Sequence, residues 1–187
     1  MVNLTFKNAF KYPFNRAKGM LNIFLIFLPI VGWFALGGYG VRIIQEFSKG
    51  KFKQLPTLSF GSDFTLGFFM FIKAIPFVVV YGVLMGILTV INPVVRGLAQ
   101  FFLIVFVIPI LSINFMNKQT VGSYFEFNIL KYVFDNLGEY TIAWLKSLLL
   151  GIIFAFMSII LIGIPASVFC KNIFFADFYW RKVKTKK

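Results

Sequence analysis

The sequence predicts an all-α integral membrane protein with six helices in three hairpins, the first and last of them short or re-entrant, plus interfacial amphipathic helices. Of its 187 residues, 59% are apolar and only 13% are charged, a balance far from that of a soluble domain. Four runs of 21 to 24 residues carry no charge, and each is long enough to cross a hydrocarbon core of about 30 Å as a helix. These runs are Gly19–Val41, Ala74–Val95, Gly97–Asn117 and Ser147–Cys170. Four transmembrane spans are the alternative.

Residues 1–18 predict a basic interfacial helix. Three phenylalanines recur every four residues along it, at Phe6, Phe10 and Phe14. Lysines lie on the other side, so we expect this helix to rest in the headgroup plane with its aromatic face toward the bilayer. Asn3 is a candidate cap for its start, and Pro13 is expected to end or kink it.

Proline and glycine interrupt the first and last charge-free runs. Pro29 and Gly32 fall within the first run, and Gly163 and Pro165 within the last, and both pairs favour a break in a helix. The expected helices cover residues 18–29 and 32–49 in the first run, and 139–162 and 166–183 around the last. A single kinked span is the alternative for the first run.

Between these breaks, the sequence predicts two long apolar helices and one amphipathic helix. The long helices cover about residues 64–91 and 96–117, with a turn at Asn92-Pro93 between them. Gly82 and Gly86 are spaced for a close contact with another helix of the protein. Residues 120–136 put polar and apolar side chains on opposite faces, which is typical of an amphipathic helix.

The distribution of Lys and Arg favours six helices over four. If the first and last runs fold back on themselves, 18 of the 19 basic residues face one side and only Arg96 faces the other. With four spans, the division is 11 against 8. Because basic residues gather on the cytoplasmic side of membrane proteins, we expect both termini in the cytoplasm of a prokaryotic cell.

The residue types present exclude several chemistries. The chain has no histidine and a single cysteine, Cys170, so it offers no imidazole base and no Cys-rich zinc site. Its six acidic residues all lie outside the charge-free runs, unlike the buried carboxylates of proton pumps. We therefore expect no catalytic residue, no metal, no cofactor and no enzymatic activity. Anionic lipid headgroups explain the net charge of +13 better than nucleic acid does, because the cations flank apolar spans.

Four cations lie one or more helical turns inside the expected cytoplasmic boundary of the membrane: Arg42, Lys73, Lys146 and Lys171. A cation in apolar surroundings is costly, so these residues are candidates for a functional site. If they converge, they form one cytoplasm-facing basic cavity for an anion or a lipid phosphate; the alternative is that each reaches the phosphate layer separately. Three acidic residues are available to neutralise such cations: Glu46, Asp63 and Glu126. Asp177 and Arg181, four residues apart, predict a local ion pair.

One part of the sequence resembles an uncharacterised family. It comprises Gly38-Tyr39, Arg42, Gly50, Leu55-Pro56, Asp63 and Gly67, and the C-terminal Phe178-Tyr179-x-Arg181 is also similar. These features resemble a domain-of-unknown-function family of small archaeal and bacterial integral membrane proteins. The resemblance implies a polytopic membrane protein without an established activity, and it transfers no catalytic residue.

The sequence thus predicts a single membrane domain over residues 1–187. It consists of the basic segment 1–18, a helical bundle over 19–183 and the end of a basic tail, 184–187. The expected role is that of an accessory or scaffold subunit of the cell membrane; the alternative is a small transporter or a lipid- or anion-binding protein that uses the basic cavity. The expected partners are membrane lipids, through anionic headgroups at the cytoplasmic face, and another membrane protein or a second copy of the chain, but no nucleic acid.

Overall fold

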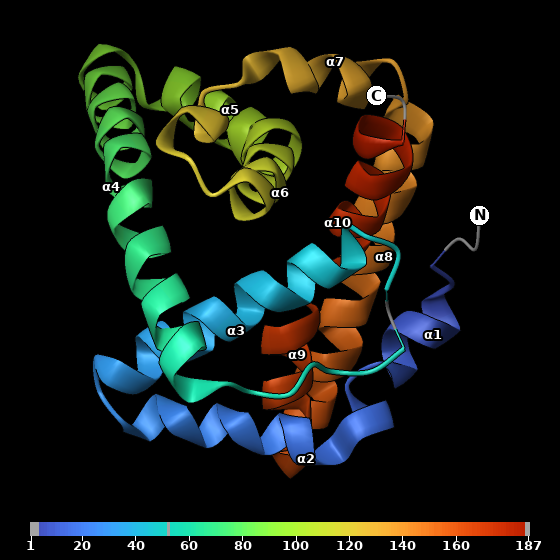
Figure 1. The fold of residues 1–187 in the computed structure, drawn as a ribbon. Coiled ribbons are helices and arrows are strands. Elements are labelled where there is room, and N and C mark those ends of the chain that lie inside the picture. Colours follow the sequence, from blue (N-terminus) through green and yellow to red (C-terminus); the bar gives the residue numbers. More distant parts are fainter. Residues whose placement is uncertain (1–3, 52, 186–187) are drawn as a thin grey trace.

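The structure is a computed structural model that describes residues 4–51 and 53–185, and all regular elements in these ranges are helical (Figure 1). The longer helices are α3 (Val31–Phe47), α4 (Phe60–Ile91), α5 (Pro93–Phe102), α6 (Ile108–Lys118) and α8 (Leu137–Met157). The shorter ones are α1 (Phe6–Lys11), α2 (Ala17–Met20), α7 (Leu130–Phe134), α9 (Gly163–Cys170) and α10 (Ile173–Tyr179). Short 3-10 or π segments are η1 (Phe14–Arg16), η2 (Leu21–Phe27), η3 (Leu103–Val107), η4 (Val121–Tyr124), η5 (Phe127–Ile129), η6 (Ser158–Ile160) and η7 (Trp180–Lys184). The all-α prediction is confirmed.

Three helices among the described residues are long and apolar enough to cross a membrane. They are Phe60–Ile91, Pro93–Lys118 and Leu137–Ile160. The turn between the first two is fixed by Asn92, whose side-chain oxygen accepts hydrogen bonds from the backbone N–H groups of Val94 and Val95 at 2.8 and 3.3 Å. Length and composition thus indicate a membrane protein, whereas the six-helix topology stays a prediction.

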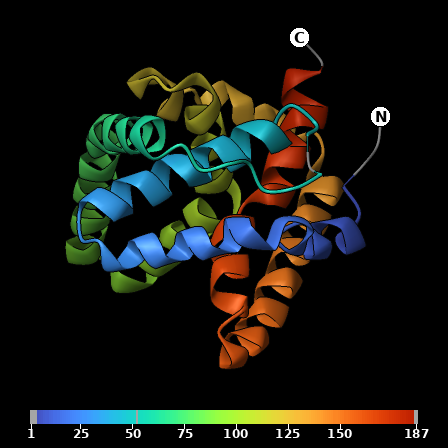
Figure 2. The same ribbon diagram turned by 60° about the horizontal axis from the view of Figure 1, so that its bottom comes forward.

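The first charge-free run folds back on itself, as predicted. η2 and α3 lie side by side (Figure 2), joined by a turn at which Ile30 has a φ of 64°. A Cβ on Gly32 would lie 1.8 Å from the backbone oxygen of Leu25, so only glycine fits where the two segments meet. The indole N–H of Trp33 donates to the oxygen of Ile26 at 2.9 Å and closes the hairpin.

The last charge-free run also folds back, but its second arm differs from the prediction. A Cβ on Gly163 would lie 2.0 Å from the backbone oxygen of Phe154, so α8 and α9 touch through backbone atoms at the turn. α9 begins at Gly163 rather than at residue 166, because proline is tolerated in the first turn of a helix and Pro165 occupies that turn. The predicted helix 166–183 is also interrupted, since a turn at residues 171–172 separates α9 from α10.

α3 and α4 cross with their backbones in direct contact. A Cβ on Gly38 would lie 1.9 Å from the oxygen of Asp63, and a Cβ on Gly67 would lie 1.9 Å from the oxygen of Phe34. The prediction of a close helix contact at Gly82 and Gly86 is wrong, because a Cβ at either position would meet no atom within 4 Å. Close approach is therefore set by the glycines at the crossing.

The N-terminal segment is not the flat interfacial helix that was expected. α1 ends at Lys11, just before Pro13, as predicted, and Thr5 caps its start by accepting from the N–H of Asn8 at 3.2 Å. Asn3, the predicted cap, lies outside the described residues. The aromatic stripe packs against the protein instead of facing a bilayer. Its ring contacts are Phe6 with Phe174, and Phe10 and Phe14 with Phe154. The reason is that α8 and α10 offer an aromatic surface within reach.

The predicted amphipathic helix over residues 120–136 is also wrong. The chain reverses at Gln119, which has a φ of 56°, and then forms only η4, η5 and the short α7. Buried Asn114 of α6 donates to the oxygen of Ser123 beyond this reversal, and the partly exposed Lys118 and Glu126 form an ion pair across it. Contacts with α6 therefore override the local helical pattern.

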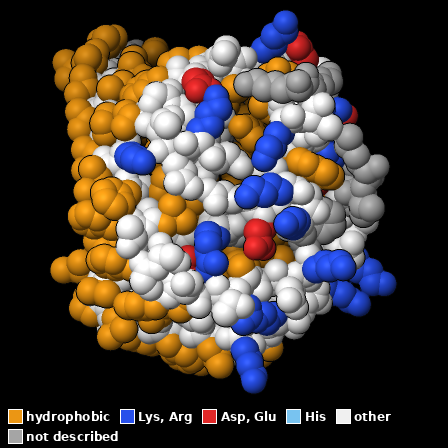
Figure 3. Space-filling model, in the orientation of Figure 1, with side chains coloured by type: hydrophobic (Ala, Val, Ile, Leu, Met, Phe, Trp, Pro, Cys, Tyr) orange, Lys and Arg blue, Asp and Glu red, His pale blue; other side chains and the backbone are white. Residues whose placement is uncertain are grey.

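Charged and apolar surfaces are separated on the molecule. Figure 3 shows Lys and Arg side chains spread over the face toward the viewer, with hydrophobic side chains gathered along its left and lower edges. α4 runs along that left edge (Figure 1) and exposes a series of large apolar side chains. An exposed apolar surface of this extent is typical of contact with lipid or with another protein.

Candidate functional site

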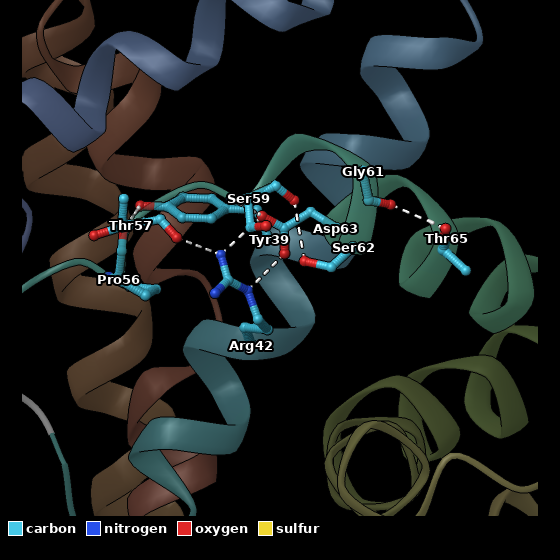
Figure 4. Close-up of polar contacts among 9 residues, drawn as sticks. All are labelled: Tyr39, Arg42, Pro56, Thr57, Ser59, Gly61, Ser62, Asp63 and Thr65. Atoms are coloured by element: carbon cyan, nitrogen blue, oxygen red, sulfur yellow. Dashed lines mark hydrogen bonds and ion pairs between the residues drawn. The ribbon is translucent and has the colours of Figure 1, made fainter.

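Arg42, the first of the predicted site residues, belongs to an ion pair with a buried carboxylate. Its Nε lies 2.5 Å from Oδ1 of Asp63, and its Nη2 donates to Oδ2 of Asp63 at 2.7 Å and to the oxygen of Thr57 at 2.6 Å (Figure 4). The backbone N–H of Ser59 donates to the same carboxylate at 2.8 Å. The Asp63 side chain is fully buried although it lies outside the charge-free runs, and it is one of the three acidic residues that the sequence offered to neutralise such a cation. Arg42 is thus neutralised in place.

Several of the residues behind the family resemblance lie around this pair. Gly38 and Gly67 make the crossing, and the hydroxyl of Tyr39 donates to the oxygen of Pro56 at 3.0 Å. Leu55 is fully buried beside them. We use the name crossing unit for three parts together: the crossing of α3 and α4, the Arg42–Asp63 pair, and the loop that they hold. Its hydrogen bonds attach the loop between α3 and α4 to the helices, which is a structural task.

The three predicted lysines have separate surroundings. Lys73 Nζ donates to the backbone oxygen of Gln119 at 2.9 Å. Lys146 Nζ lies 6.0 Å from the centroid of the Phe174 ring, within the range of a cation–π contact. Lys171 lines a small cavity between α8 and α9, different from the cavity that Lys73 lines. None of these contacts joins two of the four predicted cations, and anion binding by the three lysines stays a prediction.

Ion pairs between side chains attach the C-terminal helix, α10 with η7, to α8. Arg181 donates from Nε to Asp177 at 2.9 Å, which confirms the predicted local pair, and from Nη1 to Glu139 at 2.6 Å. Lys182 is also paired with Glu139. Asp177 is a second buried carboxylate that the sequence did not lead us to expect. These cations of the tail are therefore bound to carboxylates of the protein.

A polar cavity of about 960 Å³ lies between the C-terminal ends of α3 and α6, the segment from Glu126 to Tyr132, and the α10–η7 helix. Its floor contains buried Asn114, whose side-chain oxygen accepts from the hydroxyl of Tyr179 at 2.8 Å. The Asn114 amide donates to the oxygen of Ser123 at 2.8 Å and to Glu126 at 3.1 Å. The floor is thus a hydrogen-bonded network that holds three segments in register.

The charges lining this polar cavity are unbalanced. Among the described residues that line it, four are lysines, Lys49, Lys118, Lys131 and Lys184, and one is acidic, Glu126. Glu126 is paired with Lys118. Lys49, Lys131 and Lys184 are exposed, and among the described contacts only Lys184 has a hydrogen bond from its ammonium group, to the oxygen of Ser48 at 3.5 Å. An excess of positive charge around a concave polar site attracts anions.

Sequence reasoning predicted a basic cavity but missed the residues that make it. The predicted cations lie within or beside apolar runs, whereas Lys49, Lys131 and Lys184 lie in loops or near helix ends. One signal was available in Asn114 and Asn117, two amides at the end of a charge-free run just before Lys118. Amides in an apolar helix need polar partners, which points to a polar site at that helix end.

The three long apolar helices indicate a helical protein that associates with membranes. The chain belongs to the family described as "Protein of unknown function (DUF4013)", which matches residues 21–163 and so includes the crossing unit and most walls of the polar cavity. No curated protein and no solved structure matches the chain.

Proposed function

We propose that this chain is a multi-pass protein of a prokaryotic cell membrane that binds a phosphate-bearing anion in its polar cavity, from the cytoplasmic side and without catalysing a reaction. The observation that carries the proposal is the charge imbalance of the cavity, four lysines against one glutamate that is already paired. Phosphate is the anion class favoured, since lysine ammonium groups and amide donors both suit its oxygens.

The proposed topology has six helices in three hairpins with both termini in the cytoplasm. The observation that supports it is that the first and last charge-free runs turn back where proline and glycine predict. Figure 3 also shows many basic side chains in one view of the molecule, which would interact with the anionic headgroups of the inner leaflet where they lie near it.

The cavity favours a binding role over an accessory or scaffold subunit. A scaffold acts through its outer surface and needs no polar cavity with excess cations. The buried network of Asn114 and Tyr179 fixes the segments that surround the cavity, so little ordering is required when an anion enters.

The test is a titration of the purified full chain in a zwitterionic detergent, followed by calorimetry. One arm uses inorganic phosphate and the other uses dihexanoyl phosphatidic acid, so the arms distinguish a soluble anion from a lipid headgroup. We expect saturable binding in at least one arm. The triple variant Lys49→Gln, Lys131→Gln and Lys184→Gln should lower the affinity about tenfold or more, because each exposed lysine near the anion contributes up to about 1 kcal/mol.

A matched triple variant controls for net charge. Lys7→Gln, Lys11→Gln and Lys53→Gln remove the same charge from exposed positions outside the cavity, and should change the affinity less than twofold or so. If neither ligand saturates the wild-type protein, or if both triple variants weaken binding equally, the proposal is wrong.

A further inference from the structure

A second cavity, this one apolar, lies beside α3 next to the polar cavity. It has a volume of about 570 Å³ and is formed by α3, α4 and α6. Apart from the glycines Gly37 and Gly67, its lining side chains are all apolar. Gly37 forms part of its floor on α3, and a Cβ there would meet no atom within 4 Å. We call this cavity the apolar groove.

The apolar groove and the polar cavity adjoin along one face of α3. Gly37 and Val41 line the groove, and Gln45, the next residue at a spacing of four, lines the polar cavity. The side chain of Gln45 donates to the backbone oxygen of Met116 at 2.7 Å, and Met116 lines the groove. This hydrogen bond therefore lies at the boundary between the polar cavity and the apolar groove.

The dimensions of the groove suit a hydrocarbon chain. Its α3 wall extends from Trp33 to Val41, which is about 12 Å at the rise of an α-helix. Trp33, at one end of this wall, is 57% exposed. Trp33 and Phe71 belong to the exposed apolar surface that faces lipid in the proposed topology. A chain can thus enter from the membrane and end at the polar cavity.

We infer that the ligand of the polar cavity is a lipid with a phosphate headgroup, and that one of its acyl chains lies in the apolar groove along α3. The inference rests on the proposed function, because the headgroup is the anion bound there. Charge attracts the headgroup, and dispersion contacts along the groove select a ligand that carries a long chain. The site then distinguishes a membrane lipid from soluble phosphate.

The first test compares chain lengths on the wild-type protein. Native mass spectrometry from detergent measures the retention of dipalmitoyl and dihexanoyl phosphatidic acid, which share one headgroup. We expect the long-chain lipid to be retained about tenfold more strongly, since the short chains end before they fill the groove. Equal retention of the two lipids would overturn the acyl-chain inference and leave the headgroup proposal standing. If neither lipid binds and inorganic phosphate does not bind either, the acyl-chain inference and the headgroup proposal are both wrong.

The second test fills the groove from α3. Gly37→Leu places a side chain in the groove and should lower the preference for the long-chain lipid to about twofold or less, with binding of the short-chain lipid unchanged. Gly40→Leu is the matched control on the same helix, because a Cβ there also meets no atom within 4 Å and Gly40 does not line the groove. It should keep the full preference.

A further variant approaches the groove from the opposite wall. Phe71→Ala shortens a side chain of α4 that lines the groove, and it should also lower the long-chain preference. If Gly37→Leu and Phe71→Ala both keep the wild-type preference, the inference is wrong. It is equally wrong if they leave lipid retention unchanged but alter the oligomeric mass in the same spectra, since the groove would then be a protein interface.

Discussion

The crossing unit and the polar cavity both bring charged side chains together near α3, but their charge balance differs. In the crossing unit, the one cation, Arg42, meets a fully buried carboxylate at 2.5 Å. In the polar cavity, four lysines share one glutamate. A matched ion pair is complete without a ligand, and its net effect on stability is small once desolvation is included. Excess cations around a concavity remain available to an anion from outside.

Depth within an apolar run led to Arg42, which is paired with a carboxylate, and not to the cations that line the polar cavity. Arg42 was a candidate because it directly follows a charge-free run of 23 residues. Its partner is 21 positions further along the chain, at the start of the next long helix. Charge balance after folding separates the two regions, so variants of the crossing unit should change stability, and variants of the cavity should change binding.

The largest effect is expected for Gly67→Ala. The new Cβ would lie 1.9 Å from the backbone oxygen of Phe34, so the helices must separate. We expect a loss of about 3 kcal/mol or more and a Tm lower by about 6–12 °C. The measurement is the labelling of Cys170 by a thiol-reactive fluorophore during heating, since this single cysteine is buried in the folded chain.

The matched control for the glycine substitution is Gly86→Ala, on the same helix. A Cβ there meets no atom within 4 Å, and alanine favours helix more than glycine does, so the Tm should stay equal or rise. Equal loss of stability in both variants would show that the helix, and not the crossing, is sensitive.

A smaller loss of stability is expected for Asp63→Asn. The change leaves Arg42 without its counter-charge, and because the Arg42 side chain is 30% exposed, the cost should be about 2 kcal/mol, below that of a fully buried pair. The same thermal labelling measures it. The double variant Arg42→Gln with Asp63→Asn should recover part of the Tm. Phosphate affinity should equal that of the wild type in the single and in the double variant. A marked change in phosphate affinity would mean that the crossing unit belongs to the binding site.

The smallest effect, and the one of opposite sign, is expected for Glu126→Gln. Removal of the Glu126 carboxylate releases Lys118 from its ion pair and should raise phosphate affinity about threefold, with little change in Tm. Calorimetry at two salt concentrations measures the gain, which should shrink as salt rises. Asp135→Asn removes an exposed carboxylate outside the cavity and serves as the control. A similar gain in both variants would indicate a long-range effect of net charge.

Much of the helical layout follows from local sequence. The two long apolar helices were predicted to within a few residues, because Asn92-Pro93 marks their turn and apolar content marks their length. The segment over residues 120–136 was mistaken for one helix because its local pattern is amphipathic, and the ion pair of Lys118 with Glu126 is not visible in that pattern. The aromatic stripe of α1 was assigned to lipid for the same reason, since its partners on α8 and α10 are distant in sequence.

By itself, the sequence determined the two turns that reverse the first and last charge-free runs, and which stretches suit a membrane. Proline and glycine act through the geometry of their own backbone, so Pro29 with Gly32 and Gly163 with Pro165 mark these turns without reference to distant residues. Only the tertiary structure decided which cations are neutralised and which surround a cavity. Coulomb interactions depend on distance in space, and the chain brings Arg42 to Asp63 while it gathers lysines from four separate segments around one carboxylate.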